Sequence, residues 1–215
     1  KDYKINNEKN NWLIRCNQLR KDLKLPSIKG NPINSYYLIQ CLNKYSKPNN
    51  IFVNDAGSAN YICSQGLELK EGQRELTSGA FYSMGVAVPL AIGASIADPK
   101  AQVITITGDG SIELNIQELR TISINNLNIK LFIINNGGYA SIRKSQDDMV
   151  GGRYTDDIEI LNFSKVAAAF ELPFFIIDDY NNFDSLLPDV LSNNQPALIE
   201  VVCDPNQEIL EVFKE

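Results

Sequence analysis

The chain has 215 residues, of which 44% are hydrophobic and 21% are charged, and its formal net charge is −6. This acidic balance excludes nucleic acid as an expected partner, because binding to phosphate backbones needs a concentrated positive surface. The chain contains no histidine, which excludes Ser-His-Asp hydrolysis, His-ligated zinc and imidazole acid–base catalysis.

The four cysteines lie far apart and form no C-x-x-C pair, so we expect reduced thiols and neither a zinc site nor a redox pair. The chain has no apolar run of about 18 residues and no signal peptide. We therefore expect a cytoplasmic protein without a membrane partner. The first residue is Lys and not Met, which predicts that the sequence begins inside a longer polypeptide.

The first predicted element is an amphipathic helix over residues 10–25, which ends before Pro26. Its apolar positions follow helical spacing: Trp12, Leu13, Cys16, Leu19 and Leu23. The sequence thus predicts two parts, a linker helix within 1–30 and one domain over 31–215.

From residue 31 onward, helical patterns alternate with short apolar runs. The predicted strands are 51–55, 75–78, 102–109, 129–136, 173–178 and 196–202. The predicted helices are 35–44, 59–65, 84–97, 112–124, 162–170 and 182–191. This alternation predicts an α/β fold of three αβα layers around a parallel sheet of about six strands. Such sheets bind ligands at the carboxyl ends of their strands.

Two of these strand ends carry polar and glycine-rich sequences. Gly108-Asp109-Gly110-Ser111 follows one strand, and Asn135-Asn136-Gly137-Gly138-Tyr139 follows the next. They face each other if the two strands are neighbours. Glycines allow close backbone approach, and the N-terminus of a helix attracts anions. Mg²⁺ prefers carboxylate and carbonyl oxygens that are completed by phosphate and water, so Asp109 and Asn136 predict a metal–diphosphate site.

Each segment alone also fits an ordinary turn or loop. Together they are more specific, because the 24 residues from 111 to 134 accommodate one crossover helix and one returning strand. A dinucleotide-binding Rossmann site is excluded, since no G-x-G-x-x-G follows a strand.

G-D-G followed at this distance by N-N resembles the binding motif of enzymes that depend on thiamine diphosphate (ThDP). The resemblance covers about 34–204 and is greatest to acetolactate synthase-like proteins. It implies that ThDP and Mg²⁺ are the cofactors. It also implies that Asp109, Asn136 and the backbone carbonyl of Gly138 bind the metal.

The resemblance extends to further cofactor contacts. The segment from Thr77 to Ala94 places Met84 where a bulky apolar side chain holds ThDP bent, although without the family Met84 would be read as a core residue. The resemblance assigns Ser58 to the diphosphate, and a role as N-cap of the following helix is compatible with that contact. The implied cofactor-binding residues are Gly57, Ser58, Ala59, Ser83, Met84, Gly108, Gly110, Ser111, Asn136, Gly138, Tyr139, Ala140 and Ile142.

The resemblance implies decarboxylation of a 2-keto acid, followed by addition to a second carbonyl or to a proton, with the cofactor as electron sink. No catalytic residue is expected in this chain, because the family's activating glutamate lies on a pyrimidine-binding domain supplied by a partner protomer. The implied state is therefore a homo-oligomer. The isolated chain is expected to bind Mg²⁺-ThDP weakly or not at all, and to be inactive.

Two positions bear on the substrate. Ile142 stands where pyruvate decarboxylases carry a glutamate, which favours a carboligase. Ser145 precedes Gln146 where branched-chain acetolactate synthases carry a tryptophan, which implies a different or larger acceptor pocket.

Two alternatives stay open. The chain is either a fragment of a longer enzyme or a separate small subunit of a two-chain ThDP decarboxylase, and its start and the linker helix favour the fragment. A non-catalytic phosphate- or nucleotide-binding α/β module is the other alternative, since a fold alone does not determine function.

Overall fold

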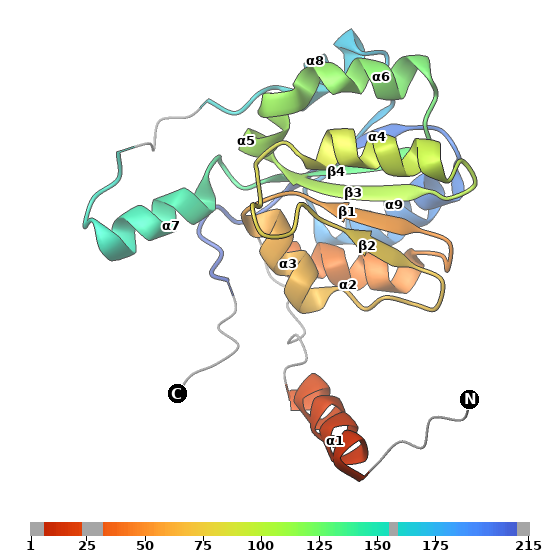
Figure 1. The fold of residues 1–215 in the computed structure, drawn as a ribbon. Coiled ribbons are helices and arrows are strands. Elements are labelled where there is room, and N and C mark those ends of the chain that lie inside the picture. The colour runs from red at the N-terminus through yellow and green to blue at the C-terminus, as the bar shows by residue number, and fades with distance from the viewer. Residues whose placement is uncertain (1–6, 23–31, 155–158, 210–215) are drawn as a thin grey trace.

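A computed structural model describes residues 7–22, 32–154 and 159–209. Its centre is a sheet of six parallel strands in the order β2-β1-β3-β4-β6-β5 (Figure 1). The strands are β1 (Ile51–Asn54), β2 (Arg74–Leu76), β3 (Val103–Gly108), β4 (Ile129–Asn135), β5 (Phe174–Ile177) and β6 (Ala197–Val202). The predicted parallel α/β sheet is confirmed.

Helices cover both faces of this sheet. The helices of the described residues are α1 (Asn7–Asp22), α2 (Ser35–Tyr45), α3 (Ser58–Gly66), α4 (Ala87–Ala97), α5 (Asp109–Ile112), α6 (Leu119–Ile124), α7 (Ala140–Met149), α8 (Phe163–Ala169) and α9 (Tyr180–Ser192), with a 3₁₀ segment at Glu113–Glu118. Of these, α1 and α7 do not lie on a face of the sheet (Figure 1). In Figure 1, α4, α6 and α8 lie above the sheet and α2 and α3 lie below it. Helix α7 lies beyond the ends of the strands, at the left of the view.

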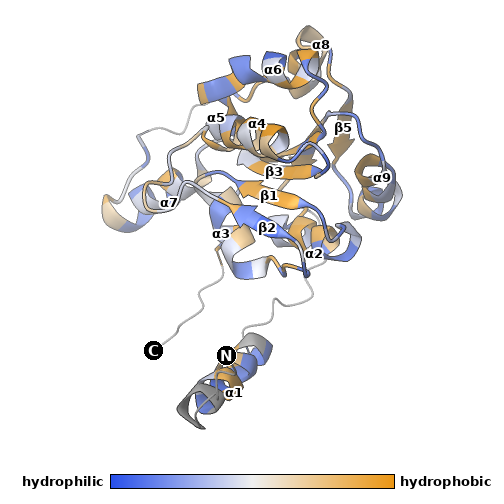
Figure 2. Cartoon of the chain, turned by 45° about the vertical axis from the view of Figure 1, so that its right-hand side comes forward, coloured by the Kyte–Doolittle hydropathy of each residue, from blue (hydrophilic) through white to orange (hydrophobic). Residues whose placement is uncertain are grey.

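Strand β4 shows why the core has two halves. Successive side chains of a strand point to opposite faces, so Phe132 and Ile134 pack in the cluster with α2, α3 and α9. Leu131 and Ile133 pack in the cluster with α4, α6 and α8. Figure 2 shows the apolar colour of β1 and β3 inside the sheet and the polar colour of the edge strand β2.

The order of the strands places a binding site. The chain leaves β1 toward β2 on one side, and it continues from β3 toward β4 on the other side. The carboxyl ends of β1 and β3 therefore flank the point where the direction of winding reverses, and open α/β sheets bind ligands there. The predicted neighbours β3 and β4 do pair, from Val103 with Ile129 to Gly108 with Ile134.

Three helical regions of the structure differ from the prediction. Helix α7 was not predicted, because its sequence is polar and its buried residue is Arg143. The helix predicted over 112–124 is three segments, and Asn115 has a non-helical backbone. Its Nδ2 donates to the carbonyl of Gly85 at 3.0 Å, and such side-chain bonds compete with helical ones. The helix predicted from residue 84 begins at Ala87, because Gly85 has a φ of 80°.

The predicted linker helix corresponds to α1, which ends at Asp22. Residues 23–25 of that prediction lie outside the described residues, so the domain boundary near residue 30 stays a prediction. Cys41, Cys63 and Cys203 are buried and Cys16 is half-buried, and all four are free thiols. Within the described ranges, every helix is too short or too polar to cross a membrane.

Candidate functional site

A cavity of about 260 Å³ opens at the carboxyl ends of β1, β3 and β4. The loops after these strands, the segment before α4 and the start of α7 line it. The lining residues are Ala56, Gly57, Ser58, Met84, Gly108, Asp109, Gly110, Ser111, Ile134, Asn136, Gly138, Tyr139, Ala140, Ser141 and Ile142. Sequence segments that are up to 86 residues apart thus meet in one place.

The structure brings the predicted site residues into this cavity, with two exceptions. Ala59 is fully buried in the core cluster under α2 and α3, because the first turn of α3 turns its side chain toward the sheet. Ser83 is exposed and does not line the cavity. The residue that precedes α3 as its N-cap is Gly57, with a φ of 61°, and not Ser58.

Asp109 is the buried acid of the cavity, with 2% of its surface exposed. Its Oδ1 accepts from the amide of Gly110 at 2.8 Å. Its Oδ2 accepts from the amides of Asn136 at 3.0 Å and Gly138 at 2.9 Å. Burial raises the pKa of Asp109, and these three hydrogen bonds oppose that rise. A carboxylate has about four lone-pair sites, so one position stays available for a cation.

Asn136 and Ser58 are the next polar pair. Nδ2 of Asn136 donates to Oγ of Ser58 at 3.3 Å. Because this bond uses the amide nitrogen, the amide oxygen is available to a cation. Ser58 acts as the acceptor, so its own hydroxyl hydrogen is available to a ligand.

The carbonyl of Gly138 is the third oxygen of the predicted metal set. It accepts from the amide of Ala140 at 2.7 Å, and a carbonyl oxygen has a second lone pair. Tyr139, between these residues, has φ −68° and ψ 63°, the values of an inverse γ-turn. One carboxylate, one amide oxygen and one carbonyl are hard ligands of the kind that Mg²⁺ uses together with phosphate oxygens and water.

Among the described residues, no cationic side chain lines the cavity. Asp109 is the one charged side chain among the described lining residues. In the described part of the chain, there is also no group of three His, Cys, Asp or Glu side chains that could hold a metal ion by itself. The residues present therefore fit a metal only if its ligand brings further oxygens.

Asp55 organises the cavity from behind. It is buried, and it accepts from the amides of Ala56 at 2.8 Å and Gly85 at 2.9 Å and from the hydroxyl of Thr107 at 2.9 Å. These bonds join the end of β1, the segment before α4 and the end of β3. Burial raises the pKa of Asp55. The sequence alone predicted residue 55 as the end of a strand, with no role in the site.

Met84 is held at the cavity by the turn that precedes α4. It is 37% exposed and lines the cavity, so it is not the core residue that its apolar context alone would indicate. A β-carbon on the next residue, Gly85, would lie 2.8 Å from Cβ of Leu114 and 3.0 Å from the carbonyl oxygen of Ser111. Close packing of this turn therefore requires glycine.

Three lining residues, Ala56, Ile134 and Ser141, were not predicted from the sequence. The neighbours Ala140 and Ile142 were predicted, but the helix that carries them was not. Oγ of Ser141 is buried and has no hydrogen-bond partner among the described residues. It lies 3.4 Å from the position that a β-carbon on Gly57 would take. This hydroxyl is a polar group that a ligand of the cavity can satisfy.

A family model and individual relatives place the chain in the same family. The family described as "Thiamine pyrophosphate enzyme, C-terminal TPP binding domain" matches residues 55–201; thiamine pyrophosphate (TPP) is ThDP. The acetolactate synthase isozyme 1 large subunit of Escherichia coli K12 is 29% identical over 92% of this chain and 36% of its own length. The acetolactate synthase large subunit of Pyropia yezoensis is 32% identical over 91% of this chain and 34% of its own.

Pyruvate oxidase of Lactiplantibacillus plantarum is 29% identical over 80% of this chain and 29% of its own length. The chain thus spans about a third of the length of these relatives. The match covers the loops after β1, β3 and β4 that form the cavity. The chain belongs to the thiamine pyrophosphate enzyme family, as a C-terminal TPP binding domain of the acetolactate synthase-like kind.

Proposed function

We propose that this chain binds the diphosphate of ThDP through Mg²⁺ in a 2-keto acid decarboxylase or carboligase of the acetolactate synthase type. The observation that carries the proposal is the meeting of Asp109, Asn136 and Gly138 in one cavity. Family membership supports ThDP as the ligand. The three oxygens supply the ligand chemistry that Mg²⁺ prefers.

The charge of the cavity supports the metal. A diphosphate is an anion, and the one charged side chain of the lining, Asp109, is an acid. Two negative groups repel each other in a site of low polarity. A divalent cation between them reverses the sign of the interaction, so we expect diphosphate binding to require Mg²⁺.

Hydroxyl groups supply the remaining diphosphate contacts in this proposal. Gly110 was predicted to bind the cofactor, but its amide donates to Asp109 in the structure. The hydroxyls of Ser58, Ser111 and Ser141 line the same cavity and can donate to phosphate oxygens. Ser141 has the greatest need for such a partner, because its Oγ is buried and unpaired within the described chain.

Apolar side chains are assigned to the rings of the cofactor. Met84, Tyr139 and Ile142 line the cavity, and we propose that they exclude water and orient the rings. When bound, ThDP supplies an electron sink for decarboxylation of a 2-keto acid. Ile142 carries no acid group, so it cannot deliver a proton to the reacting carbon, which favours a carboligase or transferase over a lyase that makes aldehyde. Ser145 before Gln146 favours a larger acceptor pocket.

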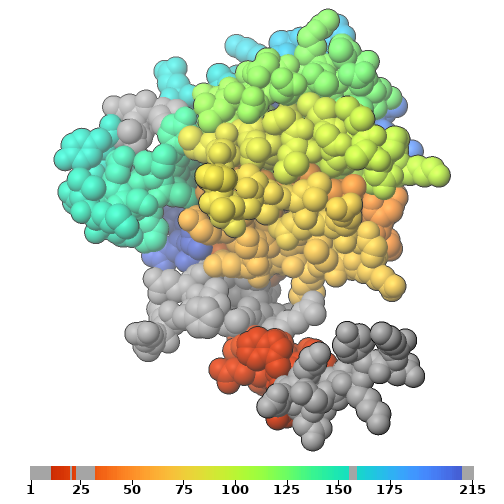
Figure 3. All heavy atoms as spheres, viewed as in Figure 1, coloured from red at the N-terminus to blue at the C-terminus, as the bar shows by residue number. Residues whose placement is uncertain are grey.

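The remaining parts of the site are assigned to a partner protomer. Phe81 is 88% exposed and stands three residues before Met84 in the sequence; a large exposed apolar side chain beside a site supports a contact surface. Figure 3 shows α7 in turquoise beside the yellow surface of the segment before α4. We propose that the pyrimidine-binding domain of a homo-oligomer partner, with its activating glutamate, covers this region. A cytoplasmic location also stays a prediction.

Calorimetric titration of the purified chain with ThDP, with and without Mg²⁺, tests the proposal. We expect weak binding that requires Mg²⁺ and disappears in Asp109→Ala. Asp98→Ala, which removes an acid outside the cavity, should bind as the wild type does. Equal binding in the presence of a chelator would contradict the metal site and favour a plain phosphate-binding module. Robust decarboxylation by the chain alone would contradict the assignment of the activating group to a partner.

A further inference from the structure

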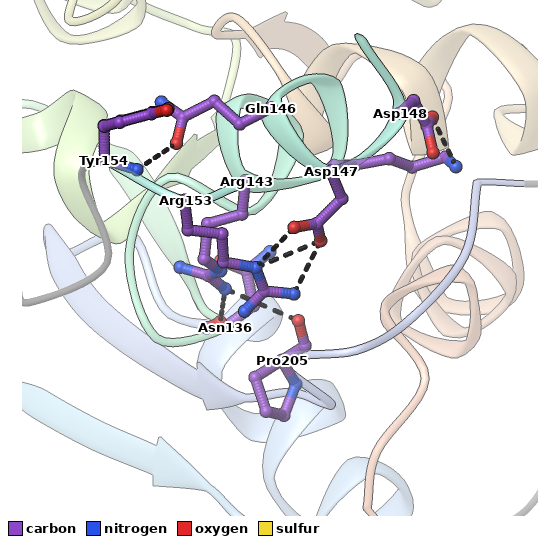
Figure 4. Close-up of polar contacts among 9 residues, drawn as sticks. Asn136, Arg143, Gln146, Asp147, Asp148, Arg153, Tyr154 and Pro205 are labelled. Carbon is purple, nitrogen blue, oxygen red and sulfur yellow. Dashed lines mark hydrogen bonds and ion pairs between the residues drawn. The ribbon is translucent and has the colours of Figure 1, made fainter. Parts of the chain in front are cut away.

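Arg143 is the one residue of α7 that is buried as a whole within the described structure, and its side chain is a cation. Arg143 is 7% exposed, whereas an amphipathic helix usually buries an apolar stripe. A buried guanidinium needs hydrogen-bond acceptors, because an unpaired buried charge is very costly. Figure 4 shows it between Asn136 and Pro205, below the axis of α7.

Backbone carbonyls are acceptors for this guanidinium. Nη1 of Arg143 donates to the carbonyl of Gly137 at 2.7 Å, and Nη2 donates to the carbonyl of Asn136 at 3.1 Å. A longer contact of 3.4 Å joins Nη2 to the carbonyl of Pro205, after β6. Hydrogen bonds from a charged donor are stronger than neutral ones. Arg143 thus connects α7 and the C-terminal segment to the loop after β4.

The same loop is held from its other side by Asp109. The amides of Asn136 and Gly138 donate to Asp109, and the carbonyls of Asn136 and Gly137 accept from Arg143. The carboxylate of Asp109 therefore accepts from amides of the loop, and the guanidinium of Arg143 donates to its carbonyls. Asn136 and Gly138 line the cavity, whereas Gly137 does not. The shorter bond of Arg143 thus goes to the carbonyl of a residue outside the cavity lining.

This loop needs a restraint. Gly137 has a φ of 77° and Gly138 a φ of 97°, and two consecutive glycines lose more conformational freedom on ordering than other residues do. Metal sites also depend on outer groups that orient the direct ligands. The structure supplies such a group from α7, seven positions after Asn136 in the sequence.

We infer that Arg143 is the positioning residue of the loop Asn136–Gly138: it holds the carbonyls of Asn136 and Gly137 and so presents the Asn136 side chain and the Gly138 carbonyl to the cation. The inference rests on the proposed function for the identity of that cation as Mg²⁺. The geometry of the loop itself does not depend on any ligand.

Hydrogen exchange of the loop amides in the ligand-free chain is the first measurement. The amides of Asn136 and Gly138, which donate to Asp109, report whether the loop is ordered. In Arg143→Met we expect them to exchange at least tenfold faster, and in Arg143→Lys we expect an intermediate rate. The matched control is Arg153→Met, which removes a neighbouring cation whose ion pair is with Asp147, at 2.8 Å.

Mg²⁺ titration at a fixed, high ThDP concentration is the second measurement. We expect Arg143→Met to raise the apparent dissociation constant for Mg²⁺ about tenfold or more, with partial recovery in Arg143→Lys and no change in Arg153→Met. Wild-type exchange rates in folded Arg143→Met would overturn the inference, as would equal effects of Arg143→Met and Arg153→Met. If the wild type alone binds no Mg²⁺-ThDP, cation binding by the isolated chain fails as a readout, and the exchange rates alone decide the role of Arg143.

Discussion

A β-carbon placed on Gly110 would lie 2.4 Å from Cε1 of Tyr139, so the tyrosine ring packs directly on the backbone of the glycine. This contact joins the loop after β3 to the residue that precedes α7. It leaves no space for a side chain at position 110, and it holds one wall of the cavity in place.

Gly110→Ala should therefore displace the Tyr139 ring and destabilise the chain by about 1–3 kcal/mol, the usual cost of overpacking. Chemical denaturation measures this loss. Gly93→Ala is the matched control, because a β-carbon on Gly93 meets no atom within 4 Å, and alanine favours a helix over glycine. Equal stability of the two variants would contradict the packing argument, whereas Gly110→Ala combined with Tyr139→Ala should recover part of the loss.

Asp109 should titrate above the ordinary range of an aspartate, because burial raises its pKa. A cation must bind the ionised form, so Mg²⁺ together with ThDP should lower this pKa again. Carboxyl ¹³C NMR of Asp109, with and without both ligands, measures the two values. As pH falls, protonation should compete with the metal and weaken its binding. An Asp109 pKa that does not respond to Mg²⁺-ThDP would argue against direct coordination.

Ser141→Ala should separate stability from binding. The hydroxyl is buried and unpaired in the described structure, so its removal should leave the ligand-free chain as stable as before or slightly more stable. If it donates to a phosphate oxygen, the affinity for Mg²⁺-ThDP should fall about fivefold, which corresponds to about 1 kcal/mol. Thermal unfolding and calorimetry give the two readouts. Ser185→Ala, on the exposed side of α9, should change neither, and unchanged affinity in Ser141→Ala would exclude the contact.

Lys130 should make stability depend on pH. It is 1% exposed at the start of β4, donates to the carbonyl of Gln195, and burial lowers its pKa to about 8. Between pH 8 and 10.5 the unfolded chain binds more protons at this residue than the folded chain does. Stability from this group should therefore rise with pH across that window, by up to about 1.4 kcal/mol per unit.

Denaturation at several pH values tests this dependence in the wild type and in Lys130→Met. Lys130→Met should lose the rise in stability between pH 8 and 10.5. Lys144→Met, which removes an exposed lysine that pairs with Asp148, should keep that rise. An equal rise in stability in all three proteins would show that a group other than Lys130 causes it.

The sequence by itself determined the layers of the fold and the centre of the site. Apolar runs such as residues 131–134 are typical of strands inside a sheet covered on both faces, and the alternation with helices makes that sheet parallel. The spacing from Asp109 to Asn136 then placed two polar loops on adjacent strands, which the pairing of β3 with β4 confirms. These features are local, or they follow from chain order.

Only the tertiary structure decided how that site is supported. Asp55, Ser141 and Arg143 have partners or neighbours from other strands and loops, and no periodic pattern marks them. Helix α7 escaped prediction because it buries an arginine, whose acceptors are backbone carbonyls on the loop after β4 and after β6. Hydrophobic periodicity detects helices that bury apolar stripes. A helix that is fixed by hydrogen bonds to a distant backbone becomes visible only when the strands that carry that backbone are in place.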